Sequence, residues 1–67
     1  MMKIEDVRVY YEDGTIKYSS VGKAREALRK RGFKMIEHED MFYGTYFFGI
    51  KELWGKPGQC AELLVLI

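Results

Sequence analysis

One segment of this 67-residue chain has the pattern of an amphipathic helix, and stretches with strand patterns lie on both sides of it. When residues 19–33 are placed at intervals of about 100°, Val21, Ala24 and Leu28 fall on one side, with Ala27 at its edge. The charged residues on the opposite side are Arg25, Glu26, Arg29 and Lys30, with Lys23 at the margin. The pattern predicts one helix of about 12 residues, roughly 18 Å long, whose apolar side packs on a sheet.

Both ends of this helix have sequence signals. Ser19 or Ser20 can accept a hydrogen bond from a free backbone N–H of the first turn. At the other end, the basic residues 29–31 favour the negative end of the helix dipole. Gly32 can adopt the left-handed conformation that ends a helix, and Phe33 can then fold back as its apolar contact.

Two strands and a tight turn are predicted before the helix. Residues 4–11 alternate as in a half-buried strand. The dipeptide Asp13-Gly14 suits a two-residue type I′ turn, in which both central residues have positive φ. That turn pairs Tyr11 with Ile16. The predicted core-facing residues are Val7, Val9, Tyr11, Ile16 and Tyr18, and the predicted outward-facing residues are Arg8, Tyr10, Glu12, Thr15 and Lys17.

Three further strands are predicted after the helix. Residues 33–38 have a strand pattern, and the acidic residues 37–40 then take the chain into solvent. Residues 41–51 form an aromatic-rich strand whose glycines, at 44 and 49, mark a bulge or a close approach. Residues 55–58 form a turn. The length and β-branched residues of segment 60–67 favour a buried strand, although its sequence AELL would also suit a helix.

These elements predict an α+β fold in one domain, residues 1–67. The predicted architecture is a small single-layer sheet, β-β-α-β-β-β and mainly antiparallel, with the amphipathic helix on one face. A chain of this length buries only about 60% of the surface that it exposes when unfolded. Small domains often gain stability from a disulfide, a metal or a second subunit, and the single cysteine allows no internal disulfide. One helix cannot cover five strands on both faces, so we predict a homodimer packed through the open face of the sheet.

The helical segment concentrates positive charge. Residues 23–34 hold six basic residues and one acid, which leaves five basic and nine acidic residues elsewhere out of totals of 11 and 10. The six basic residues are Lys23, Arg25, Arg29, Lys30, Arg31 and Lys34. One interpretation is salt-dependent binding of nucleic-acid phosphates. The commoner alternative is a solvated face that serves solubility and the helix dipole, with Glu26 and Lys30 paired.

Residues 42–48, with the sequence FYGTYFF, hold five of the ten aromatic side chains. Aromatic residues on a sheet can stack on the bases of RNA, but they also dominate protein cores and interfaces. As one continuous strand, this segment places Phe42, Tyr46, Phe48 and Ile50 on one face and Tyr43, Thr45 and Phe47 on the other. We favour packing against the core or a partner over base stacking.

No set of residues has the spacing of a catalytic or metal site. The chain has one histidine and one cysteine. In a strand, His38 and Asp40 would point one way and Glu37 and Glu39 the other, so at most two ligands converge, and we expect a solvated turn here. Cys60 is expected to be a buried packing residue. We predict no enzyme activity, no metal and no cofactor, since catalysis would require His38 in a pocket with carboxylates from elsewhere.

We predict a small non-enzymatic interaction protein, a regulator or inhibitor of the kind that phages and mobile elements encode. It would bind a surface of a larger protein as a homodimer. The predicted contact residues are Lys23, Arg25, Arg29, Lys30, Arg31, Lys34, Tyr10 and Tyr46. The alternative is a nucleic-acid-binding protein that uses the basic helix, Lys23–Lys34, with the sheet aromatics. No signal peptide is evident, and the longest apolar run, residues 63–67, is too short to span a membrane, so we expect a cytoplasmic protein without membrane association.

Overall fold

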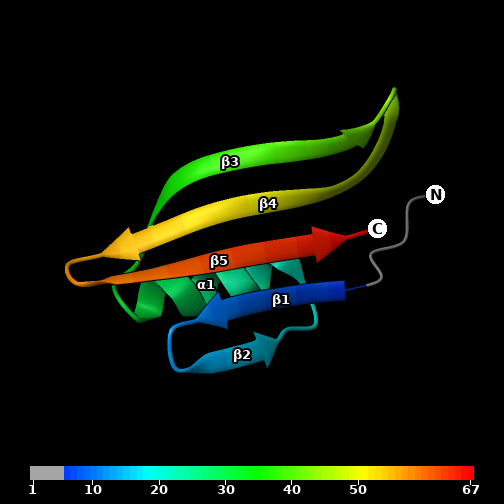
Figure 1. Ribbon diagram of the computed structural model, residues 1–67. Helices are drawn as coiled ribbons and strands as arrows, with labels where there is room; N and C mark the ends of the chain where they lie inside the picture. Colours follow the sequence, from blue (N-terminus) through cyan, green and yellow to red (C-terminus); the bar gives the residue numbers. More distant parts are fainter. Residues whose placement is uncertain (1–5) are drawn as a thin grey trace.

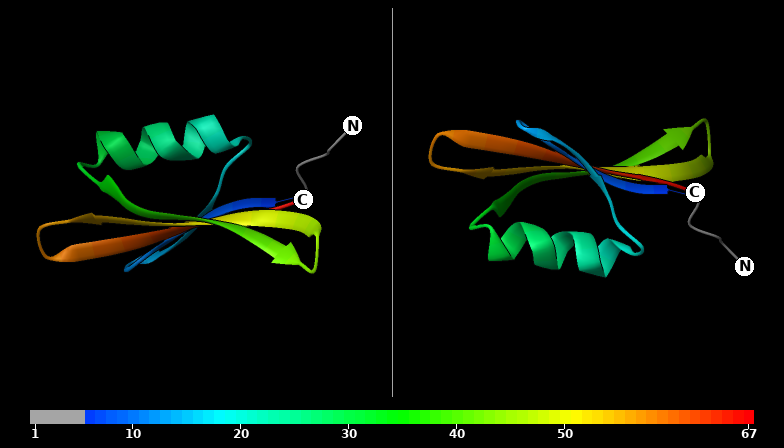
Figure 2. Two further views of the ribbon diagram at one scale, coloured as in Figure 1. Left: turned by 90° about the horizontal axis from the view of Figure 1, so that it is seen from above. Right: turned by 90° about the horizontal axis from the view of Figure 1, so that it is seen from below.

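Five antiparallel strands form one sheet in the computed structural model, which describes residues 6–67 (Figure 1). The elements are β1 (Asp6–Tyr11), β2 (Gly14–Lys17), α1 (Val21–Lys30), β3 (Lys34–Tyr43), β4 (Tyr46–Lys56) and β5 (Gln59–Leu66). The strand order is β2-β1-β5-β4-β3, and α1 lies on one side of the sheet (Figure 2). The predicted element order is confirmed, and the fold is mostly sheet. The predicted strand start at Ile4 lies outside the described residues.

Helix α1 has the ends that the sequence predicts. Ser20 is the N-cap, and its side-chain oxygen accepts a hydrogen bond from the backbone N–H of Lys23 at 3.2 Å. At the other end Gly32 has a φ of 89°, and the N–H of Phe33 donates to the carbonyl of Leu28 at 3.0 Å. This bond is part of a Schellman motif. It turns the chain back, and Phe33 is buried in the core.

The hairpin of β1 and β2 has the predicted faces but a different register. The structure pairs Val9 with Ile16, and Tyr11 with Gly14, so the two-residue loop is Glu12-Asp13. The predicted type I′ turn was wrong, because that turn requires positive φ at Asp13 and no residue other than glycine has positive φ within residues 6–67. In the structure positive φ occurs instead at Gly14, the first residue of β2. The register differs by two residues, so Ile16 stays on the same face as Val7, Val9 and Tyr11. The prediction that Ile16 faces the core was wrong, because β2 is an edge strand and Ile16 is 38% exposed.

The second hairpin corrects the predicted boundaries of the middle strands. The acidic residues 37–40, predicted as a solvated turn, lie inside β3, and the turn falls at Gly44-Thr45. Gly44 has a φ of 64°, which glycine adopts at little cost. Strand β3 is an edge strand with exposed side chains, so it accommodates consecutive charged residues.

Gly49 permits a close approach between β4 and β5, as predicted for a glycine in this strand. A Cβ atom here would lie 2.3 Å from the carbonyl oxygen of Val65 and 2.9 Å from Cε of Met41. The β3–β4 register shifts beside it, and Phe42 pairs with Phe47 at a ring separation of 5.5 Å. The predicted placement of these two rings on opposite faces was wrong, because a turn divides the segment that the prediction treated as one strand.

Strand β5 lies in the middle of the sheet, so the strand prediction for the C-terminal segment is confirmed over the helical alternative. The preceding turn is Pro57-Gly58, shorter than predicted, because β4 extends to Lys56. The prediction of a buried Cys60 was wrong, since this cysteine is free and exposed. It alternates with Ala61, which faces the core, so its side chain points to the other side of the sheet.

The core lies between α1 and one face of the sheet. Ala24 and Leu28 are the fully buried helix residues, as predicted. The sheet and the end of the helix contribute Val7, Val9, Tyr11, Phe33, Trp54, Ala61, Leu63 and Val65. Within residues 6–67, no helix has the length and apolar character needed to cross a membrane.

The face of the sheet opposite α1, the open face, mixes apolar and charged side chains. Leu64 is half-buried and lies between Arg8 of β1 and Lys51 of β4. Lys51 also pairs with Glu62 at 3.6 Å. Charged neighbours therefore shield part of the apolar surface on this face. The homodimer through this face stays a prediction.

The hairpin of β3 and β4 extends beyond the helix-covered part of the sheet. Strands β3 and β4 continue past the ends of β1 and β5 (Figure 1). The N-terminal end of α1 is the end nearer the β3–β4 turn, and it lies well short of that turn (Figure 2). We call residues 42–48, at this end of the hairpin, the aromatic tip. Its side chains lie away from the core that α1 forms with the sheet.

Candidate functional site

The eight predicted contact residues do not form one surface. The basic residues lie on or just after α1, Tyr10 lies on the open face, and Tyr46 lies at the aromatic tip. The structure instead presents three candidate sites. They are a polar cluster around Glu52, a basic cavity at the C-terminal end of α1, and the aromatic tip.

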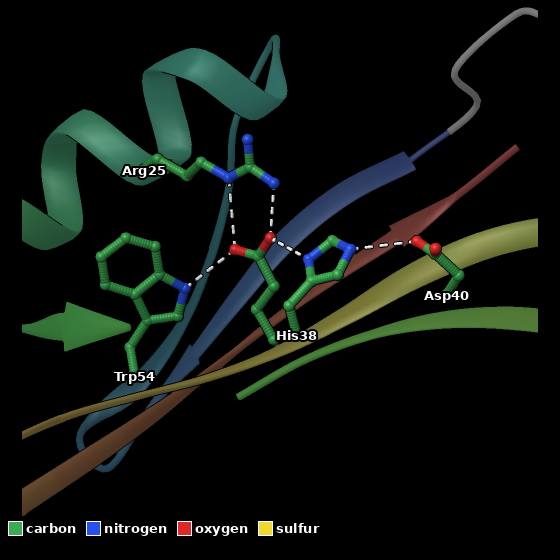
Figure 3. A network of polar contacts seen from close by, with 5 residues as sticks. Arg25, His38, Asp40 and Trp54 are labelled. Atoms are coloured by element: carbon green, nitrogen blue, oxygen red, sulfur yellow. Dashed lines mark hydrogen bonds and ion pairs between the residues drawn. The ribbon is translucent and has the colours of Figure 1, made fainter. Parts of the chain in front are cut away.

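Glu52 of β4 is the centre of the polar cluster, and its side chain is 0% exposed. Its Oε1 accepts hydrogen bonds from Arg25 Nε at 3.2 Å and from Trp54 Nε1 at 3.0 Å. Its Oε2 accepts from Arg25 Nη2 and lies 2.7 Å from His38 Nδ1 (Figure 3). Both carboxylate oxygens therefore have two partners, which offsets the cost of burying the charge.

Arg25 reaches from α1 across to this carboxylate, which corrects its predicted place on the solvated side of the helix. Arg25 directly follows Ala24, so its side chain leaves the helix at the border of the buried side. The guanidinium binds both oxygens of Glu52, the geometry that makes arginine–carboxylate pairs strong. The pair holds α1 against β4. The guanidinium of Arg25, which was predicted to contact a partner, is bound to Glu52 instead.

His38 of β3 lies between two carboxylates. Its Nδ1 faces Glu52, and its Nε2 lies 3.0 Å from Oδ1 of Asp40 (Figure 3). Carboxylates only accept hydrogen bonds, so both ring nitrogens donate when the imidazole is protonated. The hydrogen bonds to Glu52 and then to Asp40 raise the pKa of His38 above its ordinary value of 6.5. Burial alone would raise the pKa of Glu52, but the hydrogen bonds from Arg25, His38 and Trp54 outweigh it and hold this pKa below 4.5.

We expect His38 to make stability fall as the pH rises above about 6.5. A folded-state pKa above the unfolded value adds stability that is complete below the unfolded pKa and lost as the pH rises through the folded pKa. The contribution of Glu52, whose pKa is lowered, is lost only in acid. Urea unfolding at pH 6 and pH 8 should therefore show a larger decrease for the wild type than for His38→Gln. Equal decreases would contradict this account of the cluster.

The contacts of the polar cluster serve the fold. Within residues 6–67, no hydroxyl or thiol is hydrogen-bonded to His38, and no group of three or more His, Cys, Asp or Glu side chains could hold a metal ion. The bonds join α1, β3 and β4 to one another. The cluster thus fixes the edge strand and the helix against the centre of the sheet.

The basic cavity lies between the C-terminal end of α1 and the start of β3. Its volume is about 430 Å³, and its lining residues are Arg29, Gly32, Phe33, Lys34, Met35 and Trp54. The guanidinium carbon of Arg29 lies 5.6 Å from the centre of the Trp54 ring. Of the predicted cations, only Arg29 and Lys34 line this cavity.

The other predicted cations have separate positions. Lys30 forms the predicted ion pair with Glu26, at 3.2 Å. The guanidinium carbon of Arg31 lies 4.0 Å from the centre of the Tyr11 ring. Lys23 is exposed in the first turn of α1, at the opposite end of the helix from the basic cavity. The basic segment is therefore divided between internal contacts and the basic cavity.

The aromatic tip exposes large rings. Tyr43 and Tyr46 pair across the Gly44-Thr45 turn, and they are 84% and 74% exposed. Phe42 is 56% exposed and contacts Phe47 with its ring tilted by 59°. Tyr43 was not among the predicted contact residues, although it is more exposed than Tyr46.

Sequence reasoning missed Glu52 because the predicted strand ended at Lys51. Ile50, Glu52 and Trp54 alternate on the face toward α1. A lone acid between two large apolar residues at strand spacing indicates a buried carboxylate, and a buried carboxylate requires a cationic partner.

Comparisons with protein-family models, with curated proteins and with solved structures found no match to this chain.

Proposed function

We propose that this protein binds another protein by inserting its aromatic tip into an apolar pocket of the partner. The observation that carries the proposal is the exposure of Tyr43 and Tyr46 at the end of a hairpin that projects past the helix-covered core. An aromatic side chain can bury on the order of 150–250 Å². Leaving two such rings in water gives up stabilisation that binding would recover.

The aromatic tip has the residue types of a binding hot spot. Tyrosine is enriched among the few interface residues that carry most of the affinity. Its side chain has two rotatable bonds, so ordering it on binding costs little entropy. The contact between Phe42 and Phe47 and the short Gly44-Thr45 turn fix the hairpin backbone that carries the two tyrosines. Such preorganisation lowers the cost of binding.

The charge of the hairpin indicates the surroundings of the partner pocket. Glu37 and Glu39 precede the aromatic tip in β3, where they share the open face, and both are exposed. Complementary charges steer association and select partners. We therefore propose an apolar pocket with basic residues at its rim. The function is then that of a non-enzymatic regulator or inhibitor, which acts by occupying this pocket.

Site-specific photocrosslinking tests the proposal. A benzophenone amino acid replaces Tyr43 in one variant and Tyr10, on the open face, in the matched control. We expect one covalent adduct with a different protein from position 43 and none from position 10. Adding Tyr46→Ser to the first variant should abolish the adduct, which distinguishes a specific contact from accidental labelling.

Two outcomes would contradict the proposal. An adduct of twice the mass of this chain from position 43 would show that the aromatic tip binds a second copy. An adduct from position 10 alone would place the binding surface on the open face, through which the homodimer was predicted to form.

A further inference from the structure

The basic cavity has the size of a small-molecule site. Its volume of about 430 Å³ falls within the range of roughly 300–1,000 Å³ that ligand pockets occupy. Part of its lining is apolar, and Met35, which is 49% exposed, presents its side chain there. The cavity lies at the C-terminal end of α1, whereas the aromatic tip lies beyond the N-terminal end. The two surfaces are therefore independent.

Two cations in this cavity are free to bind an anion. Within residues 6–67, neither Arg29 nor Lys34 has a carboxylate partner. Among the described residues, those that line the cavity include no acidic side chain. By contrast, Glu26 engages Lys30, and Glu52 engages Arg25. The charge of this cavity is thus uncompensated and attracts an anionic group.

The partial negative charge at the C-terminal end of α1 does not prevent an anion from binding in the basic cavity. The carbonyls at the C-terminus of a helix carry a partial negative charge. Here the carbonyl of Leu28 accepts from the N–H of Phe33 at 3.0 Å, and the carbonyl of Arg31 accepts from Lys56 Nζ at 2.8 Å. The ammonium of Lys56 therefore offsets this partial charge beside the cavity.

The lining also suits a flat ring. The guanidinium of Arg29 lies over Trp54, whose Nε1 donates to Glu52 and so holds the indole in place. A guanidinium plane is a good surface for a heteroaromatic ring, and the exposed Met35 supplies an apolar wall. Lys34 and the edge of the Arg29 guanidinium would then bind a phosphate that is linked to that ring through a sugar.

We propose that the basic cavity binds a nucleotide, a planar heterocycle linked through a sugar to a phosphate. This chemistry has two sources, a free mononucleotide and one unit of a single-stranded nucleic acid. The proposal does not depend on the aromatic tip. In this proposal Arg29 and Lys34, at the C-terminal end of the helix, bind the ligand. Lys23 and Arg25 are not part of the site.

NMR titration tests this proposal, because Trp54 is the only tryptophan and gives a single indole N–H resonance. We expect saturable shifts of this resonance and of the Met35 methyl group with uridine monophosphate. Inorganic phosphate and uridine alone should each bind at least tenfold more weakly. A ten-residue oligouridylate identifies the source: tighter binding per site than the monophosphate indicates a nucleic-acid strand, and equal binding indicates the free nucleotide.

Matched variants separate a site from general attraction to a basic protein. Arg29→Gln and Lys34→Gln should each weaken binding at least tenfold with the rest of the spectrum unchanged, whereas Lys23→Gln, at the other end of the helix, should have no effect. Absence of any saturable shift with nucleotide and oligonucleotide would overturn the proposal. An equal loss in Lys23→Gln would also overturn it, because it would show that only net charge matters.

Discussion

Replacing Glu52 by alanine should remove most of the stability of the domain. The change leaves His38 and the half-buried Arg25 without the carboxylate that binds both of them, and it leaves Trp54 Nε1 without an acceptor. Removing one partner of a buried ion pair costs up to about 3–5 kcal/mol, and the partial exposure of Arg25 and His38 places this change toward the lower end. A chain of this size has roughly 3–10 kcal/mol in total. We therefore expect Glu52→Ala to lack a stable folded baseline in urea unfolding followed by circular dichroism.

Two further variants show which property of Glu52 matters. Glu52→Gln keeps an acceptor for the indole but loses the charge, so it should be intermediate between the wild type and Glu52→Ala. Glu39→Ala removes an exposed carboxylate from the neighbouring strand and should change the free energy of unfolding by less than about 0.5 kcal/mol. A free energy of unfolding for Glu52→Ala within about 1 kcal/mol of the wild-type value would contradict the role of the cluster.

Gly49→Ala should cause the second large loss of stability. The new methyl group would lie 2.3 Å from the carbonyl oxygen of Val65, so β4 and β5 must separate or shift to admit it. Overpacking typically costs about 1–3 kcal/mol, and a rigid backbone neighbour places this site at the upper end. Thermal unfolding should show a melting temperature lowered by more than about 10 °C.

The same chemical change elsewhere serves as the control. Gly22, in the first turn of α1, has only Ser20 Oγ, at 4.0 Å, near the position of an added Cβ. Gly22→Ala should therefore raise stability by about 0.5–1 kcal/mol, because alanine favours the helix. A destabilised Gly22→Ala, or an unchanged Gly49→Ala, would contradict the contacts described at these two positions.

The helix and the core-facing residues could be predicted because local signals and apolar periodicity agree there. The cap at Ser20, the left-handed Gly32 and the buried Ala24 and Leu28 all follow from residues within one segment. The faces of β1 were also correct, since they depend only on alternation. The predicted register of the first hairpin was wrong, because the register depends on which residue at the turn takes positive φ.

The polar cluster could not be predicted from local patterns. His38 and Glu52 are partners because β3 and β4 pair over their whole length, and the prediction placed a solvent-exposed turn in the acidic segment of β3. Arg25 joins them through a contact 27 residues apart in the sequence. The aromatic tip was missed as a unit for the same reason. The glycine that makes its turn, Gly44, was interpreted as a bulge within a strand.

The affinity of a Tyr43→Ser/Tyr46→Ser variant for the crosslinked partner tests the central claim most directly. Each interface hot spot contributes about 2 kcal/mol or more, so we expect the dissociation constant to rise at least about 100-fold. Tyr10→Ser, the same substitution on the open face, should leave it unchanged, and both variants should unfold at the wild-type urea midpoint. Unchanged affinity in the double variant, with a loss in Tyr10→Ser, would contradict the claim and assign partner binding to the open face.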